Sequence, residues 1–228
     1  MISGIYKLVD GSLVQKLRFD NISNNLANVS TTAFKRDIIS FNQIPTMDYF
    51  SETDFQPGPI TYTGNKLDLA LVDHGFFKIR TPRGIRYTRD GSFALNAEGV
   101  LVTHRGDTVL GEQGPVRIEG SDISIKVDGE IVVDGQTAGK IAVVDFENRG
   151  ALRKEGQSYF RYTGEGKGEA PAARVEIRQN YLERSNVNPT EEMIKMLEAY
   201  RAFESTQKAI QCIDEITRRL VNDAALLQ

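Results

Sequence analysis

The sequence predicts an α+β protein in which an antiparallel β-domain is inserted between N- and C-terminal helices that pair as a coiled coil. Three observations lead to this prediction. Apolar residues recur at helical spacing in residues 1–32, and they do so again in residues 186–228. Between these ends, short apolar runs alternate with Asp-Gly and other turn sequences. We expect an extended linker at residues 33–65 and the β-rich domain at residues 66–185.

The C-terminal helix has a clear predicted start. Asn188 suits the N-cap, Pro189 suits the first turn, and the Glu191 side chain can bond back to the cap. Its apolar stripe repeats about every 3.4 residues, below the 3.6 of a straight helix, which favours left-handed supercoiling. A helix of roughly 38 residues, about 57 Å long, is expected to need a partner helix. Its proposed assembly contacts are Met193, Met196, Tyr200, Phe203, Ile210, Ile213 and Leu220.

The N-terminal helix carries apolar residues on two stripes, which lie about a third of a turn apart at about 100° per residue. A helix that packs once against a domain needs one apolar face, so two faces indicate burial between several neighbours. The alternative is a helix deep in the core of a single domain. The proposed assembly contacts on this helix are Ile5, Val9, Leu13, Phe19, Ile22 and Leu26.

The middle of the chain reads as short strands. Residues 33–41 are expected to leave the first helix in an extended, strand-like form, and the proline-containing stretch 43–64 reads as a loop or linker. Asp90-Gly91 between two apolar runs predicts a tight hairpin. This spacing of strands and turns indicates an antiparallel sandwich or barrel rather than parallel βαβ units. Strands are expected at 67–72, 76–80, 85–88, 92–95, 100–102, 123–127, 131–133, 140–146 and 174–181.

Composition excludes several classes of protein. The chain has 228 residues, is 40% hydrophobic and has a net charge of −3, with no dense basic stripe of the kind that binds nucleic acid. The single cysteine, Cys212, excludes an intramolecular disulfide framework and a cysteine-built zinc site. The sequence contains no apolar run of about 18 residues, so no membrane-spanning helix is expected. The N-terminus also lacks the pattern of a general secretory signal.

No constellation in the sequence predicts catalysis, a cofactor or a metal. The stretch Gly164–Gly168 lacks the spacing of a phosphate-binding loop, and it reads as a surface loop. His74 and His104, the two histidines, flank glycine turns and have no metal-ligand spacing. Arg105–Asp107 matches a short adhesion motif but reads better as a turn between strands. An enzyme with a site assembled from scattered residues stays open as an alternative.

Four stretches resemble the axial proteins of the bacterial flagellum. Ser23–Arg36 resembles the N-terminal rod signature of that family, with Ser30 and Ala33 where asparagine and glycine are typical. Thr63–Ala70 with Gly75–Phe77, and then Tyr87–Phe93, are similar to the start of its central β-domain. Leu182–Asn188, before the long helix, is similar to its C-terminal signature. The resemblance covers nearly the whole chain, and these stretches occur in the family's order.

The resemblance implies a non-enzymatic structural subunit of the flagellar basal-body rod, most like its proximal part. The run from Arg201 to Gln211 and the moderate chain length favour this position over a distal rod or hook-type axial subunit. The family further implies export without a cleaved signal peptide, a place in the periplasmic rod, and three partners: other rod subunits, copies of itself and the flagellar export apparatus. From the residues alone, a β-domain binding module with a coiled-coil dimerisation stalk is a remote alternative.

Overall fold

The computed structural model describes residues 2–41, 49–156, 158–164, 166 and 168–226, and it confirms an α+β fold with two terminal helices and a large antiparallel β region. The chain forms two compact units. We call the first, Met1–Ala27 with Asp37–Glu52 and Asn188–Gln228, the helical unit. The second, Asn28–Arg36 with Thr53–Val187, is the β unit.

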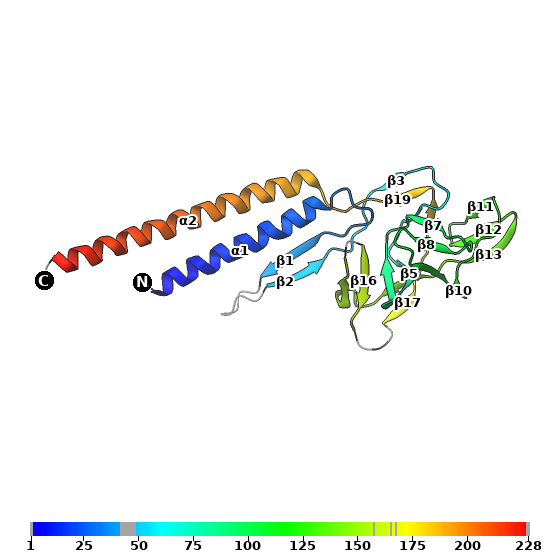
Figure 1. The fold of residues 1–228 in the computed structure, drawn as a ribbon, viewed down its shortest axis with the longest axis horizontal. Coiled ribbons are helices and arrows are strands. Elements are labelled where there is room, and N and C mark those ends of the chain that lie inside the picture. Colours follow the sequence, from blue (N-terminus) through cyan, green and yellow to red (C-terminus); the bar gives the residue numbers. More distant parts are fainter. Residues whose placement is uncertain (1, 42–48, 157, 165, 167, 227–228) are drawn as a thin grey trace. The chain divides into compact units, whose positions relative to one another are not determined.

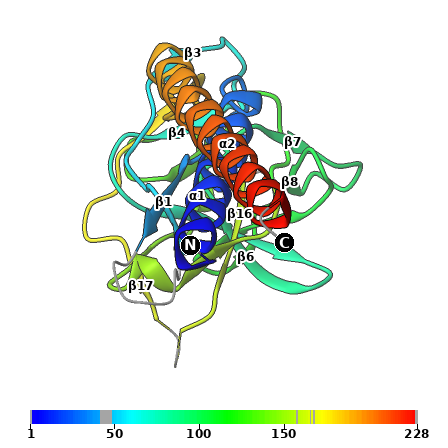
Figure 2. The same cartoon turned by 90° about the vertical axis from the view of Figure 1, so that its left-hand side faces the viewer.

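The helical unit is built on α1 (Ile2–Ala27) and α2 (Pro189–Leu226), which lie side by side (Figures 1 and 2). Gln207 Nε2 donates to Ser12 Oγ at 3.3 Å, and Asn25 Nδ2 donates to Glu192 Oε2 at 3.3 Å. The later residue of α1 therefore pairs with the earlier residue of α2, so the helices are antiparallel. Strands β1 (Asp37–Phe41) and β2 (Tyr49–Thr53) form a two-stranded sheet beside them.

The start of α2 confirms the predicted cap. Asn188 Oδ1 accepts hydrogen bonds from the backbone N–H of Thr190 at 3.1 Å and of Glu191 at 3.4 Å. Glu191 and Glu192 add negative charge at the first turn, where the helix dipole favours it. The helix runs without a break for 38 residues from Pro189.

The β unit contains several antiparallel sheets. The largest follows the order β15-β16-β6-β5-β9-β8-β7, with β10, β14 and β17 off this path. Strands β11, β12 and β13 form a second sheet, while β18 pairs with β4 and β19 with β3. Its strands and short 3-10 helix are β3 (Ile60–Tyr62), β4 (Leu69–Leu71), β5 (Phe76–Thr81), β6 (Gly84–Thr88), β7 (Phe93–Leu95), β8 (Leu101–Thr103), β9 (Thr108–Gly111), β10 (Gly114–Pro115), β11 (Ile123–Ile125), β12 (Glu130–Val133), β13 (Gln136–Lys140), β14 (Val143–Phe146), η1 (Arg149–Ala151), β15 (Leu152–Lys154), β16 (Tyr159–Tyr162), β17 (Glu169–Pro171), β18 (Ile177–Gln179) and β19 (Tyr181–Glu183).

Two apolar clusters fill the β unit. The larger is aliphatic for the most part and draws on most of the strands, including the fully buried Ile79, Val109 and Ile131. The smaller is aromatic, and its centre is Phe76, whose ring lies edge-on to Phe160 with centroids 5.6 Å apart. Alternate residues of β5 face the two clusters, since Phe77 belongs to the first and Phe76 to the second.

The predicted tight hairpin at Asp90-Gly91 is wrong. Strand β6 lies between β16 and β5, and β7 pairs with β8, so the two flanking strands are not partners. Gly91 instead lies against β4: its carbonyl accepts from the Leu69 N–H at 3.0 Å, and a Cβ on Gly91 would be 1.8 Å from the Leu69 carbonyl oxygen. Only glycine permits this close approach, so Asp90-Gly91 is a crossing between sheets.

Other turns follow the expected chemistry. Asp134 and Gly135 join β12 to β13 with φ of 49° and 83°, the left-handed pair that a two-residue hairpin requires. Asp128 and Gly129 lie between β11 and β12, as the sequence predicted. The stretch 33–65, expected to be a linker, carries strands β1, β2 and β3; its residues 42–48 lie outside the described part.

Candidate assembly interface and the buried polar network

The face of α2 that packs against α1 has a regular spacing. Eight of its buried and half-buried positions are spaced in alternating steps of four and three residues, the spacing of a seven-residue repeat, while Lys195, Ala202, Gln207 and Ala209 are also half-buried. Several of these side chains are small or polar, and only part of the seam is apolar. The seam positions are Glu192, Met196, Ala199, Phe203, Thr206, Ile210, Ile213 and Thr217.

The structure divides the predicted assembly contacts between this seam and the outer surface. Met196, Phe203, Ile210 and Ile213 lie on the seam, Leu26 is half-buried, and Ile22 is buried. The outer surface holds the other residues with described side chains, namely Val9, Leu13, Phe19, Met193 and Tyr200. The side chains of Ile5 and Leu220 lie outside the described part of the chain.

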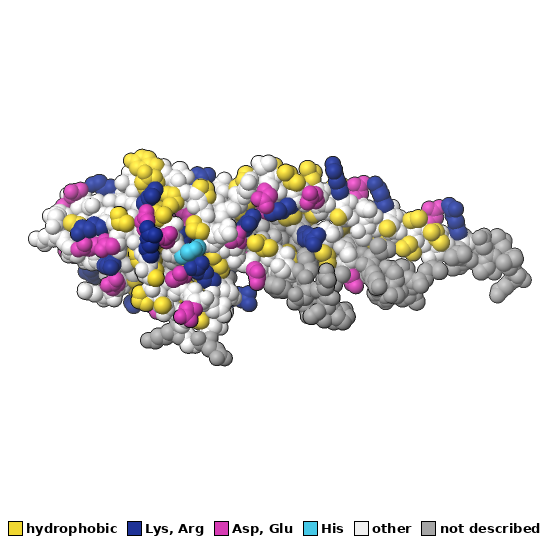
Figure 3. All heavy atoms as spheres, turned by 180° about the vertical axis from the view of Figure 1, so that it is seen from behind, with side chains coloured by type: hydrophobic (Ala, Val, Ile, Leu, Met, Phe, Trp, Pro, Cys, Tyr) yellow, Lys and Arg dark blue, Asp and Glu magenta, His cyan; other side chains and the backbone are white. Residues whose placement is uncertain are grey.

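Sequence reasoning missed part of the exposed apolar surface. Leu197 exposes 58% of its surface and Ile194 53%, although neither fits the predicted stripe. Met193, Leu197 and Tyr200 fall at i, i+4 and i+7, which places them on one face of α2. We call Met193, Ile194, Leu197 and Tyr200 the outer stripe. Figure 3 shows hydrophobic side chains at the surface along the helices.

A groove of about 350 Å³ lies between the helices next to the outer stripe. Ala199 is almost fully buried, and its short side chain leaves space that a larger residue would fill. Phe19 of α1 and Tyr200 of α2 contribute exposed rings to the lining. The remaining lining residues are Gln15, Lys16, Asp20 and Phe203.

A buried polar contact joins three elements of the helical unit. Asn25 Oδ1 accepts from the Asp37 N–H and Asn25 Nδ2 donates to the Asp37 carbonyl, both at 3.0 Å. The same amide reaches the buried Glu192 carboxylate on α2, which also pairs with Lys195 at 3.1 Å. Because Asn25 is only 2% exposed, its amide connects α1, α2 and β1 with little competition from water.

We expect Asn25→Ala to destabilise the helical unit. The change leaves the Asp37 N–H and carbonyl without their side-chain partner, and unsatisfied buried groups cost about 1–3 kcal/mol. Hydrogen exchange of the Asp37 amide should become faster, together with that of the amides at the start of α2. Unchanged exchange at Asp37 would contradict the role given to this amide.

A buried ion triad lies inside the β unit. The Glu183 carboxylate accepts from Arg89 Nε at 2.6 Å, from the Gly58 N–H at 2.7 Å and from Lys35 Nζ. All three charged side chains are at most 1% exposed. Burial lowers the pKa of Lys35 to about 8, an effect that the neighbouring Glu183 opposes. One carboxylate therefore compensates two desolvated cations.

The remaining donors of the triad bond to backbone carbonyls. Arg89 donates to Gly75 and Leu71, both at 2.9 Å, and Lys35 donates to Gln56 at 2.8 Å. Charged groups can be buried when such bonds satisfy them. The triad thereby fixes the segment that contains Lys35, which follows α1 in the sequence, to the core of the β unit.

The residues around the triad extend this fixation. Asn186 Oδ1 accepts from the Arg36 N–H at 2.7 Å, and Arg36 pairs with Asp54 at 2.9 Å. Ala33 takes a left-handed backbone with φ of 54° and donates its N–H to the Glu183 carbonyl at 2.8 Å. The conformation typical of glycine is thus retained with alanine, at a cost of roughly 1–2 kcal/mol.

Comparison with known proteins gives the family. Residues 178–223 match the family model "Flagellar basal body rod FlgEFG protein C-terminal", and residues 70–133 match "Flagellar hook protein FlgE/F/G D1 domain". The flagellar basal-body rod protein FlgF of Caulobacter vibrioides is 31% identical, with 97% of each chain covered. The chain belongs to the flagellar basal-body rod protein family. The rod protein FlgG of Bacillus subtilis is 30% identical over 97% of this chain and 99% of its own.

The residues that carry the resemblance of this rod protein to its family have structural roles. Lys35 and Arg36 come from the N-terminal signature, Arg89 from the β-domain signature, and Glu183 and Asn186 from the C-terminal signature. These positions meet in the buried triad and the bonds around it, so three distant stretches of sequence build one polar network.

Other site types find no support in the described part of this rod protein. Its residues form no group of three or more histidine, cysteine and acidic side chains that could hold a metal ion. Within the same residues, no helix has the length and apolarity needed to cross a membrane. The Nδ1 atom of His74 lies 3.2 Å from Nη1 of Arg149, in an exposed side-chain hydrogen bond.

Proposed function

We propose that this rod protein is a non-enzymatic structural subunit of the flagellar rod. Helices α1 and α2 pair as a coiled coil and pack through their exposed residues against the helices of neighbouring axial subunits. The outer stripe carries this proposal, because the described residues of the chain leave Met193, Ile194, Leu197 and Tyr200 more than half exposed. Fully burying one such side chain contributes about 1.5–3 kcal/mol.

The seven-residue seam supports the coiled-coil pairing. A seam with steps of four and three residues keeps the two helices in register over many turns when they supercoil. The outer stripe then remains available for a third helix. Non-closing, head-to-tail contacts, in which one surface of a subunit binds a different surface of the next, generate helical assemblies such as a tube.

Membership of the family supports the partners that we propose. The subunit contacts other rod subunits and copies of itself in the periplasmic rod, and the flagellar export apparatus delivers it there without a cleaved signal peptide. We place it in the proximal rod, with a distal rod or hook-type position as the alternative.

We expect Leu197→Asp combined with Tyr200→Asp to abolish swimming when this variant replaces the chromosomal gene. Both carboxylates would be desolvated in the subunit contact, at several kcal/mol per group. The isolated variant should keep its helix content because both side chains already face solvent. Swimming in soft agar and circular dichroism measure the two effects.

A matched control changes the same two positions without adding charge. Leu197→Met with Tyr200→Phe keeps the outer stripe apolar, so it should leave swimming near normal. Normal swimming of the outer-stripe variant would contradict the proposed contact. A binding module with a dimerisation stalk would instead give a stable dimer in sedimentation, whereas an isolated rod subunit should sediment as a monomer.

A further inference from the structure

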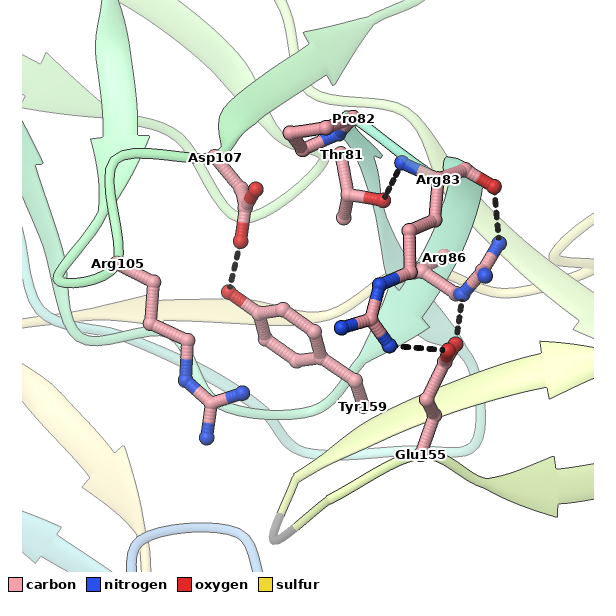
Figure 4. A pocket seen from close by; sticks show the side chains of 8 residues that line it. All are labelled: Thr81, Pro82, Arg83, Arg86, Arg105, Asp107, Glu155 and Tyr159. Atoms are coloured by element: carbon pink, nitrogen blue, oxygen red, sulfur yellow. Dashed lines mark hydrogen bonds and ion pairs between the residues drawn. The ribbon is translucent and has the colours of Figure 1, made fainter.

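A second surface hollow, of about 250 Å³, lies in the β unit (Figure 4). The turn between β5 and β6 supplies one wall, the turn between β8 and β9 another, and Glu155 and Tyr159 complete it. The predicted turn at Arg105–Asp107 is confirmed, with Gly106 at a φ of 84°. The residues that line the hollow are Thr81, Pro82, Arg83, Arg86, Arg105, Asp107, Glu155 and Tyr159.

The charges of this hollow are unequal. Three arginines face two carboxylates, and Glu155 is already held by two of the arginines: by Arg83 at 3.1 Å and by Arg86. Arg86 is further fixed, because its Nη1 donates to the carbonyls of Arg83 and Ile85. One positive charge on this side of the hollow is therefore left uncompensated.

The opposite wall is equally fixed. Tyr159 donates its hydroxyl to Asp107 at 2.9 Å, and burial raises the pKa of Tyr159 to about 12, so the hydroxyl stays protonated at neutral pH. The Arg105 guanidinium lies over the Tyr159 ring, 4.8 Å from its centroid, which orients it by a cation–π contact. Its N–H groups remain available at the surface of the hollow, as do those of Arg83 that do not bond to Glu155.

We propose that this hollow binds a single carboxylate side chain of a neighbouring axial subunit, between the guanidinium groups of Arg83 and Arg105. The surplus of one positive charge matches a monoanion, while Asp107 and Glu155 in the lining disfavour a phosphate with two charges. Arginine pairs well with carboxylate because its N–H donors match the two oxygens. The tyrosine ring and Pro82 supply apolar contacts for the methylenes of a glutamate. The identity of the partner rests on the proposed function.

The binding step is tested on the full chain by backbone amide shifts during titration with N-acetylglutamate N-methylamide. We expect saturable shifts at the turns that contain Arg83 and Arg105, and none with the glutamine counterpart of the compound. Arg83→Gln with Arg105→Gln should weaken binding about tenfold or more. Arg80→Gln, an exposed position of β5 outside the lining, should leave it unchanged.

Several outcomes would overturn the proposal. An equal response to the glutamine compound would show that charge is not recognised, and tighter binding of inorganic phosphate would assign the hollow to phosphate. Unchanged binding in the double variant would place the ligand elsewhere. Cells that carry the double variant should swim less than cells that carry Arg80→Gln. Equal swimming would contradict the claim that the hollow binds a carboxylate of a neighbouring subunit. Swimming after deletion of the whole gene would contradict the rod function instead, while the titration still decides the binding step.

Discussion

Glu183→Gln should lower the free energy of unfolding of the β unit by about 3–5 kcal/mol, because the variant leaves two buried cations without their counter-charge. Glutamine has nearly the shape of glutamate, so packing is preserved. The loss combines the missing charge with one missing acceptor, because the amide nitrogen cannot accept from Arg89, Lys35 or the Gly58 N–H. Lys35 and Arg89 would keep their bonds to backbone carbonyls, but each would remain desolvated. Urea denaturation followed by circular dichroism gives the change.

The matched variant at this site is Lys35→Met. Methionine keeps an unbranched apolar chain, and Glu183 still pairs with Arg89 and the Gly58 N–H. The loss should be less than half that of Glu183→Gln, since no uncompensated charge is left behind. An equal or larger loss for Lys35→Met, or a loss under about 1 kcal/mol for Glu183→Gln, would contradict the triad's energetics.

Phe203→Asp combined with Ile210→Asp should separate α1 from α2 in the isolated protein. Both residues are half-buried on the seam, one seven-residue repeat apart, so each new carboxylate would be partly desolvated at the contact with α1. The helix signal in circular dichroism should fall, and swimming should be lost. The β unit should keep its protease-resistant core, because its clusters do not include these residues.

This seam variant and the outer-stripe variant differ in one readout. The seam variant should lose helix content in isolation, whereas Leu197→Asp with Tyr200→Asp should lose only swimming. If the seam variant keeps full helix content, the pairing of α1 with α2 does not depend on this face. If the seam variant loses the protease-resistant core together with helix content, α2 belongs to the core of the β unit.

The sequence was sufficient for the parts of the fold that depend on local chemistry. Asn188 and Pro189 mark the start of α2 because a cap and a first-turn proline act within a few residues. The turn at Asp128-Gly129 between β11 and β12 follows from turn chemistry in two adjacent residues. The prediction at Asp90-Gly91 failed because it used local turn chemistry alone. The backbone partner of Gly91 is Leu69, which is distant in the sequence.

The exposed apolar surface of α2 was predicted in part. The apolar residues of the C-terminal helix have an average spacing of about 3.4 residues, which treats the seam and the outer stripe as one face. Met193 and Met196 were therefore assigned to the same face, although only Met196 lies on the seam. Leu197 was missed as a result. The triad of Lys35, Arg89 and Glu183 lay beyond sequence reasoning, because three isolated charges far apart in the chain have no periodicity.

Cross-linking from Leu197 in purified flagellar basal bodies tests the central claim most directly. A photoreactive phenylalanine at this exposed position should form a covalent product with a neighbouring axial subunit. The same group at Phe203, half-buried on the seam, serves as the control; it should link to α1 of its own chain and give much less product with neighbouring subunits. Mass spectrometry then identifies the linked peptides. A product from Leu197 with the helices of a neighbouring subunit is the predicted result, and basal bodies in which Leu197 links to no other subunit would contradict the account.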